Sequence, residues 1–249
     1  MTTGDPQIIP AATVVVMRER GDGPPEVLMV ERAATMRFAG GALVFPGGRV
    51  DPGDVALAGL IGGDPGDTAS RIAAIREAIE EVGLPVGLRG ACDTLAMRAA
   101  LASGAALGEL LEAAALDLDA LIPFARWLPH AGVTHRVFDT RFYLARLPDH
   151  APEPVADGGE SVRLLWASAA DVLVEADAGR AQIIFPTRRN LERLAQFDSF
   201  DAAVAHARAH PVTTITPWLE DRGGESHLCI PEGLGYPVTS QPRHSALRG

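Results

Sequence analysis

The sequence predicts an α/β protein in which a mixed β-sheet lies between two layers of helices (α/β/α), with an additional helical insert. Short apolar runs rich in β-branched residues, such as residues 11–17, indicate buried strands. Amphipathic segments such as residues 68–82 indicate helices, and the two kinds of segment alternate along the chain. Because the sequence has no internal repeat, low-complexity tract or long linker, we expect residues 1–249 to form a single domain.

The expected strands are apolar or alternating runs bounded by Gly, Pro or Asp. The first two, residues 11–17 and 26–31, are separated by the turn GDGPP, so the second is expected to return beside the first. Further strands are expected at residues 42–45, 135–147, 161–167, 213–220 and 227–230. Residues 50–67 contain five glycines and two prolines, and we expect a loop there with at most a turn of helix near residues 55–60.

The clearest helix is expected at residues 68–82, because apolar residues recur there at helical spacing: Ile72, Ile75, Ile79 and Val82. Asp67 or Thr68 can cap its start, and Gly83 can end it. Further helices are expected after Ser168, where Asp171 stands in capping-box position, and at residues 186–197 and 199–210. The alanine-rich residues 91–115 predict two helices broken near residues 103–104, within an insert that we place at about residues 88–122.

Composition excludes several classes of function. The net charge is −10, which argues against a nucleic-acid partner. All 22 basic residues are arginine, so neither a P-loop lysine nor a Schiff-base lysine is available. Cys92 and Cys229 show no CxxC spacing, which indicates two buried thiols rather than a zinc site. No apolar run approaches the ~20 residues of a membrane span, and no signal-peptide pattern is present, so we expect a cytoplasmic protein without a membrane partner.

Three glutamates crowd one side of the clearest helix. Glu77, Glu80 and Glu81 stand at i, i+3 and i+4, where like charges repel one another and raise each other's pKa. Arg76 relieves part of this repulsion through Glu80, and a divalent cation such as Mg²⁺ or Mn²⁺ would relieve more. The alternative is a solvated acidic face of an ordinary amphipathic helix.

A glycine pair lies upstream of this helix, in the stretch FPGGRVDPGD. Gly47 and Gly48 allow the backbone to approach a ligand closely, and a free carbonyl at Gly47 could also bind a metal ion. The alternative for such a pair is a simple tight turn.

Together the two stretches resemble the Nudix box, the signature of the Nudix hydrolases. Gly48 matches the first glycine of that motif, and REAIEEVGL, residues 76–84, matches its second half in order and spacing. Two features depart from the motif: Asp54 stands where its first glutamate belongs, and an insertion of 14 residues separates Asp54 from Arg76. Extended boxes of this kind, and stretches such as residues 28–48, 138–148 and 186–195, are similar to the coenzyme A-type and peroxisomal-type Nudix proteins.

The resemblance implies the Nudix fold, with the box as a loop–helix–loop that holds one to three divalent cations, Mg²⁺ or Mn²⁺, on a pyrophosphate. It implies these roles: metal ligands Glu77, Glu80, Glu81 and the Gly47 carbonyl; catalytic residues Glu77, Glu81 and Glu160, with Glu160 the candidate general base; substrate contacts Arg37, Arg49 and Gly48. Arg76 is expected to position a glutamate, and Asp54 to be an outer-shell group or a weaker ligand. His130 and His135 are expected at the surface, and Trp127 and Phe142 in the core.

Two functions follow from this resemblance. The first is a metal-dependent pyrophosphohydrolase that acts on a nucleoside diphosphate linked to another group, with coenzyme A or an acyl-CoA as the first candidate substrate. The second is a non-catalytic nucleotide-binding module that regulates a partner, which Asp54 and the long insertion would favour. A helical interaction protein with merely solvated acids is a third reading, and a homodimer is compatible with the sequence.

Overall fold

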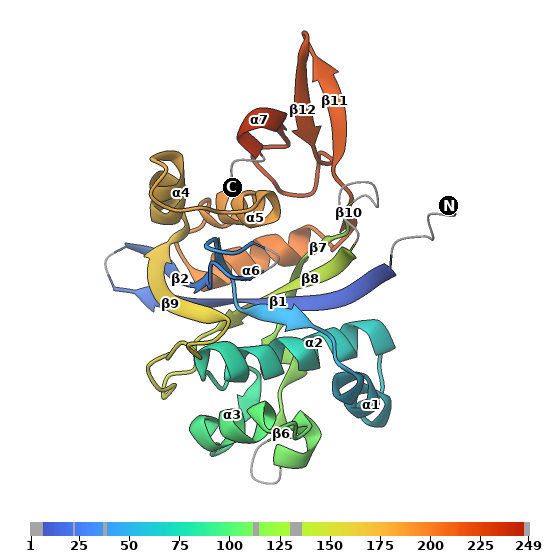
Figure 1. Ribbon diagram of the computed structural model, residues 1–249, viewed down its shortest axis with the longest axis vertical. Helices are drawn as coiled ribbons and strands as arrows, with labels where there is room; N and C mark the ends of the chain where they lie inside the picture. The colour runs from blue at the N-terminus through green and yellow to red at the C-terminus, as the bar shows by residue number, and fades with distance from the viewer. Residues whose placement is uncertain (1–6, 22, 37–38, 112–114, 130–135, 247–249) are drawn as a thin grey trace.

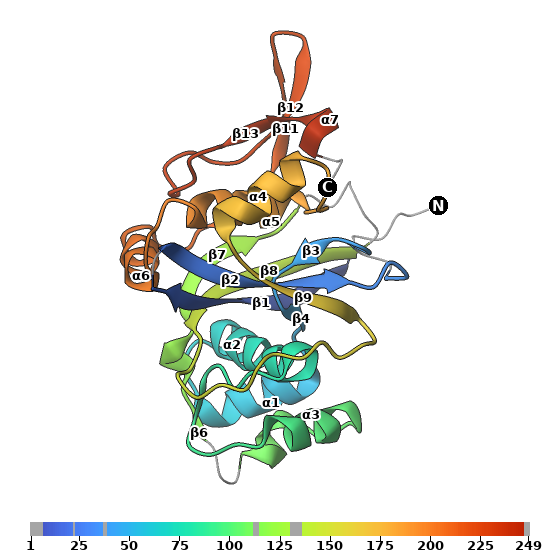
Figure 2. The ribbon, with the colours of Figure 1, turned by 90° about the vertical axis from the view of Figure 1, so that its left-hand side faces the viewer.

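The computed structural model describes residues 7–21, 23–36, 39–111, 115–129 and 136–246, and it contains an eight-stranded mixed sheet between two layers of helices (Figures 1 and 2). The strands of this sheet are β1 (Gln7–Arg20), β2 (Gly23–Arg32), β3 (Leu43–Val44), β4 (Gly47–Arg49), β7 (Ile122–Trp127), β8 (Arg136–Arg146), β9 (Ser161–Ser168) and β10 (Thr214–Ile215). Their order is β10-β7-β8-β1-β2-β3, with β4 paired to β1 and β9 paired to β2. Because β1 runs parallel to β8 but antiparallel to β2, the predicted mixed α/β sheet is confirmed.

Helices cover both faces of the sheet (Figure 2). One layer holds α1 (Pro52–Ile61), α2 (Pro65–Glu77) and α3 (Thr94–Ala102), and the other holds α4 (Ala169–Asp177), α5 (Phe185–Leu194) and α6 (Phe200–Ala209). Alternate residues of β1 serve the two layers: Val14 and Val16 join the core beneath α2, whereas Val15 and Met17 join the core beneath α5 and α6. The period-two burial of a central strand therefore produces two separate cores.

Smaller elements extend the two layers. Below α2, β5 (Leu88–Arg89) pairs with β6 (Ala115–Leu116), and short 3₁₀ turns lie at Leu107–Leu110 and Leu118–Ala120. Above α5, β11 (Trp218–Arg222), β12 (Glu225–Cys229) and β13 (Ser240–Pro242) form a three-stranded sheet that ends in α7 (Arg243–Ala246) and projects from the body (Figure 1). No described helix is both long enough and apolar enough to cross a bilayer.

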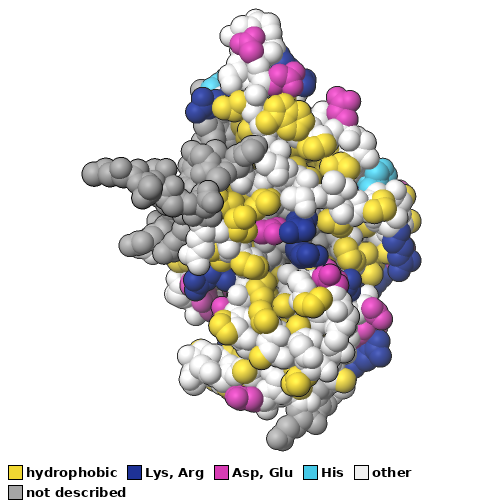
Figure 3. All heavy atoms as spheres, turned by 90° about the vertical axis from the view of Figure 1, so that its right-hand side faces the viewer, with side chains coloured by type: hydrophobic (Ala, Val, Ile, Leu, Met, Phe, Trp, Pro, Cys, Tyr) yellow, Lys and Arg dark blue, Asp and Glu magenta, His cyan; other side chains and the backbone are white. Residues whose placement is uncertain are grey.

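Ion pairs tie the sheet to the helices on the α2 side. Arg141 of β8 pairs with Asp67 of α2 at 3.3 Å, and the Tyr143 hydroxyl donates to the same carboxylate at 2.9 Å. On the face shown in Figure 3, arginine and acidic side chains lie next to one another near the middle of the molecule. Mixed charges of this kind leave that face without a broad basic surface.

Several sequence predictions are confirmed, and others are wrong. Helix α2 begins at Pro65 and is capped by Asp64, not by Asp67 or Thr68, and residues 213–220 contribute to two strands in different sheets, β10 and β11. The expected strands at 11–17, 26–31 and 161–167 lie within β1, β2 and β9, and the Ser168 hydroxyl caps α4 by accepting the Asp171 amide. Residues 50–67, expected to be a loop, contain the ten-residue helix α1, because Pro52 suits the first helical turn and Asp54 accepts the Asp51 amide at 2.9 Å. Residues 91–115 contain one α-helix and a 3₁₀ turn instead of two helices, and Cys92 is half-exposed rather than buried.

Candidate active site

Helix α2 and the turn that follows it carry the glutamate cluster. Ile72, Ile75, Ile79 and Val82 are fully buried, which confirms the predicted apolar face. The helix changes from α to π geometry over Ala78–Val82 and ends at Gly83, whose positive φ of 72° favours glycine. A π-turn contains an extra residue, so it changes the direction of Glu80 and Glu81 relative to Glu77.

The glycine pair lies directly against these glutamates. Gly47 and Gly48 belong to β4 and pair with Thr13 and Ala12 of β1. The Gly47 amide donates to Glu81 Oε2 at 2.9 Å, and a Cβ added at Gly48 would collide with the Glu77 carboxylate. Absence of a side chain at Gly48 therefore allows β4 to lie against Glu77, and its absence at Gly47 allows β4 to lie close to β1.

Arg76 lies at the centre of the cluster and is buried, with 7% of its surface exposed. Its Nη1 donates to Glu77 Oε1 at 2.9 Å and to Glu80 Oε2 at 2.6 Å. Its Nη2 donates to Asp54 Oδ2 at 3.0 Å and to the Arg49 carbonyl at 2.7 Å. One guanidinium thus holds three carboxylates and the backbone of β4 in a fixed arrangement.

The position of Asp54 explains how the extended box is accommodated. Asp54 is 2% exposed, and its carboxylate accepts from both Arg76 and the Asp51 amide. The lengthened segment between Asp54 and Arg76 contains the rest of α1 and most of α2, and the two helices bring Asp54 to Arg76 across 22 positions of sequence. Asp54 therefore anchors α1 to the arginine and does not project with Glu77 toward β4.

The acidic groups are held in an environment that disfavours their charge. Burial, opposed by the attraction of Arg76 and aided by Glu80, raises the pKa of Glu77 to about 7. Burial together with the nearby Glu77 raises the pKa of Glu81 to about 8, against the opposing effects of the Gly47 amide and Arg32. Burial likewise raises the pKa of Glu80, less strongly. These glutamates are not a solvated acidic face, because Glu81 is 5% exposed and Arg76 only partly neutralises the group.

This donor set fits a divalent cation in its chemistry. Among the described residues, no three His, Cys, Asp or Glu side chains already converge in metal-ligating geometry. However, Arg76 binds one oxygen each of Glu77 and Glu80, and the Gly47 amide binds one oxygen of Glu81. Burial, together with the neighbouring carboxylates, raises the pKa of Glu77 and Glu81, and carboxylate oxygens are the ligands that Mg²⁺ and Mn²⁺ prefer.

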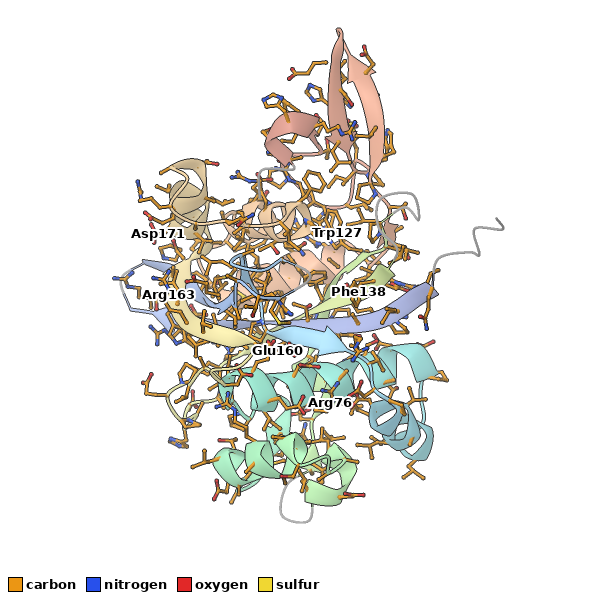
Figure 4. The ribbon with its side chains drawn as sticks, viewed as in Figure 1. Arg76, Trp127, Phe138, Glu160, Arg163 and Asp171 are labelled. Carbon is orange, nitrogen blue, oxygen red and sulfur yellow. The ribbon has the colours of Figure 1, made fainter. Side chains whose placement is uncertain are left out.

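Glu160 lies at the start of β9, at the level of the sheet next to α2, while Arg76 lies on α2 itself (Figure 4). Its side chain is 61% exposed and pairs with Arg32 of β2 at 3.6 Å. Both residues influence the charge of Glu81: Arg32 favours it and Glu160 opposes it. The structure therefore brings Glu160 into the neighbourhood of the glutamate cluster, although it was predicted from a different part of the chain.

The other predicted residues fall in different places. Arg49 is exposed, and its carbonyl oxygen accepts from Arg76. Trp127 is in the core on the α5 side of the sheet, and Phe142 belongs to the same core, as expected. Arg37, His130 and His135 lie outside the described residues.

Sequence reasoning missed Asp157. Its carboxylate accepts the backbone amides of Gly159, Glu160 and Ser161, at 3.3, 3.2 and 2.7 Å. An Asp that precedes Gly-Gly is a recognisable signal for an Asx-type turn, so the motif DGGE could have identified it. Arg32, which pairs with Glu160, has a buried Nε that lacks a hydrogen-bond partner.

Comparisons with known proteins agree with this geometry. The family model described as NUDIX domain matches residues 8–99. A crystal structure of a NUDIX hydrolase from Alicyclobacillus acidocaldarius is 32% identical, with a TM-score of 0.72, and the match covers 80% of this chain and 96% of that one. A Caenorhabditis elegans protein named "Putative nudix hydrolase 7" is 31% identical over 183 residues, 70% of this chain; the match spans 57% of the length of that curated relative. The 32% identity and TM-score of 0.72 over 80% of this chain show that it belongs to the Nudix hydrolase family.

Proposed function

We propose that this chain is a metal-dependent hydrolase that cleaves the pyrophosphate bond of a nucleoside diphosphate linked to another group. The observation that supports this most strongly is the placement of the buried Glu81 and the half-buried Glu77, which are crowded together against the glycine strand. Three carboxylates that share a single arginine are costly to bury, and such clusters are typical of sites that use their charge. When bound, Mg²⁺ or Mn²⁺ would neutralise charge on the pyrophosphate and lower the pKa of the attacking water.

The chain's own residues would divide the work as follows. Glu77, Glu80 and Glu81 would hold the metal, and the Gly47 carbonyl would add a further oxygen. Nη1 of Arg76 donates to both Glu77 and Glu80, which fixes the positions of these two carboxylates relative to each other. Gly48 would let the protein backbone approach the substrate beside Glu77, while Arg49 and Arg37 would contact its phosphates.

Glu160 would accept the proton of the attacking water. Its carboxylate is 61% exposed, unlike that of Glu81, so it can pass a proton to solvent after each turnover. Arg32 at 3.6 Å keeps it oriented. Asp157 fixes the backbone of the turn from which Glu160 projects.

Coenzyme A or an acyl-CoA is the first substrate to test, because residues 28–48 and the extended box are similar to the coenzyme A-type Nudix proteins. The experiment incubates purified protein with coenzyme A, ADP-ribose, NADH and nucleotide sugars, in millimolar Mg²⁺ or Mn²⁺ or in chelator. Products are identified by chromatography and mass spectrometry. We expect cleavage between the two phosphorus atoms, only when metal is present, and fastest for coenzyme A; turnover in chelator would contradict the proposal.

The Glu81→Gln variant separates catalysis from binding. It should still bind nucleotide but lose at least about 100-fold in rate, because removal of a metal ligand should cost more than the roughly 10–100-fold that loss of an outer-shell partner costs. Arg180→Ala is a suitable control, because Arg180 forms an exposed ion pair with Glu175 on the opposite helical layer. A wild-type chain that binds nucleotide and never turns it over would instead favour the non-catalytic regulatory module. Cytoplasmic location and a homodimer stay predictions from the sequence.

A further inference from the structure

The acidic helix ends in carbonyl groups that need partners from elsewhere in the chain. The last carbonyls of any helix have no partner within it, and here the π-turn Ala78–Val82 is the last turn. Arg98 of α3 donates from Nε to the Glu80 carbonyl at 2.7 Å. The Val155 amide donates to the Val82 carbonyl at 3.0 Å. Two segments distant in sequence thus complete the end of the helix that carries Glu80 and Glu81.

Arg98 also joins these two segments to each other. Its Nη2 donates to the Val155 carbonyl at 2.6 Å, so both polar groups at Val155 are engaged, one by Arg98 and one by the acidic helix. The guanidinium is half-buried, and its positive charge suits the negative end of a helix dipole. Loss of Arg98 would therefore release Val155 on one side and the Glu80 carbonyl on the other.

From Val155 the contacts continue to Glu160. Two residues further on, the Asp157 carboxylate accepts the amides of residues 159–161, which closes a tight turn. The turn is joined to β2 when the Ala33 amide donates to the Glu160 carbonyl at 2.8 Å. Glu160 is therefore attached through Asp157, Val155 and Arg98 to the same turn that holds Glu80 and Glu81.

We propose that Arg98 is a positioning residue that fixes the segment carrying Glu160 to the end of the glutamate-bearing helix, and so sets the distance between the proposed base and the proposed metal ligands. This inference rests on the proposed function for its catalytic consequence. Its structural part, the attachment of residues 155–161 through Arg98, is independent of turnover. The helical insert thereby gains a role, since α3 supplies the arginine.

The test compares Arg98→Ala with Arg89→Ala, a matched control because Arg89 lies in the same insert but forms an exposed ion pair with Asp117. Arg98→Ala should lower kcat by about 10–100-fold with KM nearly unchanged, whereas the control should leave both unchanged. Hydrogen exchange of the amides at residues 155–161 should accelerate in Arg98→Ala and not in Arg89→Ala. Unaltered exchange in Arg98→Ala would overturn the proposal.

A double-mutant cycle with Glu160→Gln distinguishes positioning from general loss of structure. If Arg98 acts through Glu160, Arg98→Ala should cause little further loss of rate once Glu160 is already Gln. An equal loss in both backgrounds would overturn the coupling. Asp157→Ala, which leaves the acidic helix untouched, should reproduce the loss if Arg98→Ala fails to fold. If the wild-type chain hydrolyses nothing, the proposed function fails, while the exchange comparison still decides whether Arg98 holds the segment.

Discussion

Two buried arginines on opposite sides of the sheet show how differently one side chain can be used. Arg76 is 7% exposed and Arg193 is 2% exposed. Arg76 binds the carboxylates of Asp54, Glu77 and Glu80. Arg193 instead donates to the Phe124 carbonyl at 2.7 Å and lies over the rings of Phe124 and Tyr236, at 4.1 and 5.2 Å.

The pKa values of the two arginines shift in opposite directions. Burial opposes the charge of Arg76, yet its bonds to Asp54 and the attraction of the neighbouring glutamates raise its pKa. Burial lowers the pKa of Arg193 despite the favourable effect of Tyr236. Arg76 is outnumbered by carboxylates, so its surroundings can attract a further cation. Arg193 is bound by a carbonyl and aromatic rings, so it stabilises the core without attracting another charge.

The largest expected effect is on the stability of Arg76→Met. This change leaves the buried Asp54 carboxylate without its cation, and we expect a loss of about 3–5 kcal/mol in the free energy of unfolding. Urea denaturation above pH 8 measures it, where the neighbouring glutamates are ionised. Arg76→Lys, which keeps the charge and loses the fork, should fall in between. Unchanged stability would mean that the carboxylates do not depend on Arg76.

Arg193→Met should lower the free energy of unfolding by less than Arg76→Met does, and it should not affect turnover. The methionine keeps most of the packing volume, but the Phe124 carbonyl loses its donor, and we expect a loss of about 2 kcal/mol. The same denaturation assay measures this, and kcat per folded molecule should be unchanged. A specific fall in kcat would break the comparison, because it would give the α5 side a part in the reaction.

Gly48→Ala should act on turnover, by about 10–100-fold, because its new Cβ collides with the movable Glu77 carboxylate. Gly47→Ala is the matched partner, since its Cβ collides with the backbone of Ala12 and Thr13, which cannot move independently. We therefore expect Gly48→Ala to lose kcat with a nearly unchanged melting temperature, and Gly47→Ala to lose melting temperature. The reverse result would show that Glu77 is not held against the glycine strand.

The smallest expected effect is on the pH dependence of stability, which has opposite signs on the α2 side and the α5 side of the sheet. Glu77 and Glu81 have folded pKa values of about 7 and 8, above the ordinary glutamate value of about 4.3. Their contribution to the free energy of unfolding is therefore present at low pH and is lost as the pH rises through their folded pKa values of about 7 and 8. His206, beside Arg193, has its pKa lowered to about 4 by burial and by Arg193. Its contribution is present above about pH 6.5 and is lost as the pH falls through 4.

Thermal melts of metal-free protein measure both responses, with changes of a few degrees expected. Glu81→Gln should reduce the fall in melting temperature between pH 5 and 9 and leave the fall at acid pH, which is due to His206, unchanged. His206→Gln should do the opposite. Mn²⁺ should also flatten the alkaline decline in the wild-type chain, and an equal decline with and without Mn²⁺ would argue against a cation at the glutamates.

The helix at residues 68–82 was predictable because its apolar residues recur with helical period and Gly83 marks its end. Helix α1 was missed because two glycines and a proline resemble a loop, whereas its formation depends on Asp54 meeting Asp51 and the distant Arg76. Strand β7 was missed because Pro123 interrupts a short run, and only its pairing with β8 makes it a strand. Tertiary contacts overrode local propensity in both elements.

For the site, residue spacing indicated which glutamates share a side of the helix. Spacing could not show that Glu81 is buried, because its burial comes from the packing of β4 against the helix. Nor could it show that Arg98 reaches Val155, 57 positions away, since such contacts depend on how the insert folds back. The local sequence thus indicated which residue types form the site, whereas contacts with distant segments determine its geometry.

The π-turn at Ala78–Val82 has a consequence for protein engineering. Each residue of a regular α-helix advances about 100° around the axis, so deleting one residue to regularise this turn would rotate Glu80 away from Arg76 and Glu81 away from the Gly47 amide. Thermostabilising redesign favours ideal helices and would select that deletion. A library screened for melting temperature alone should therefore accumulate well-folded variants that have lost the Glu80–Arg76 and Glu81–Gly47 contacts, and with them the proposed activity.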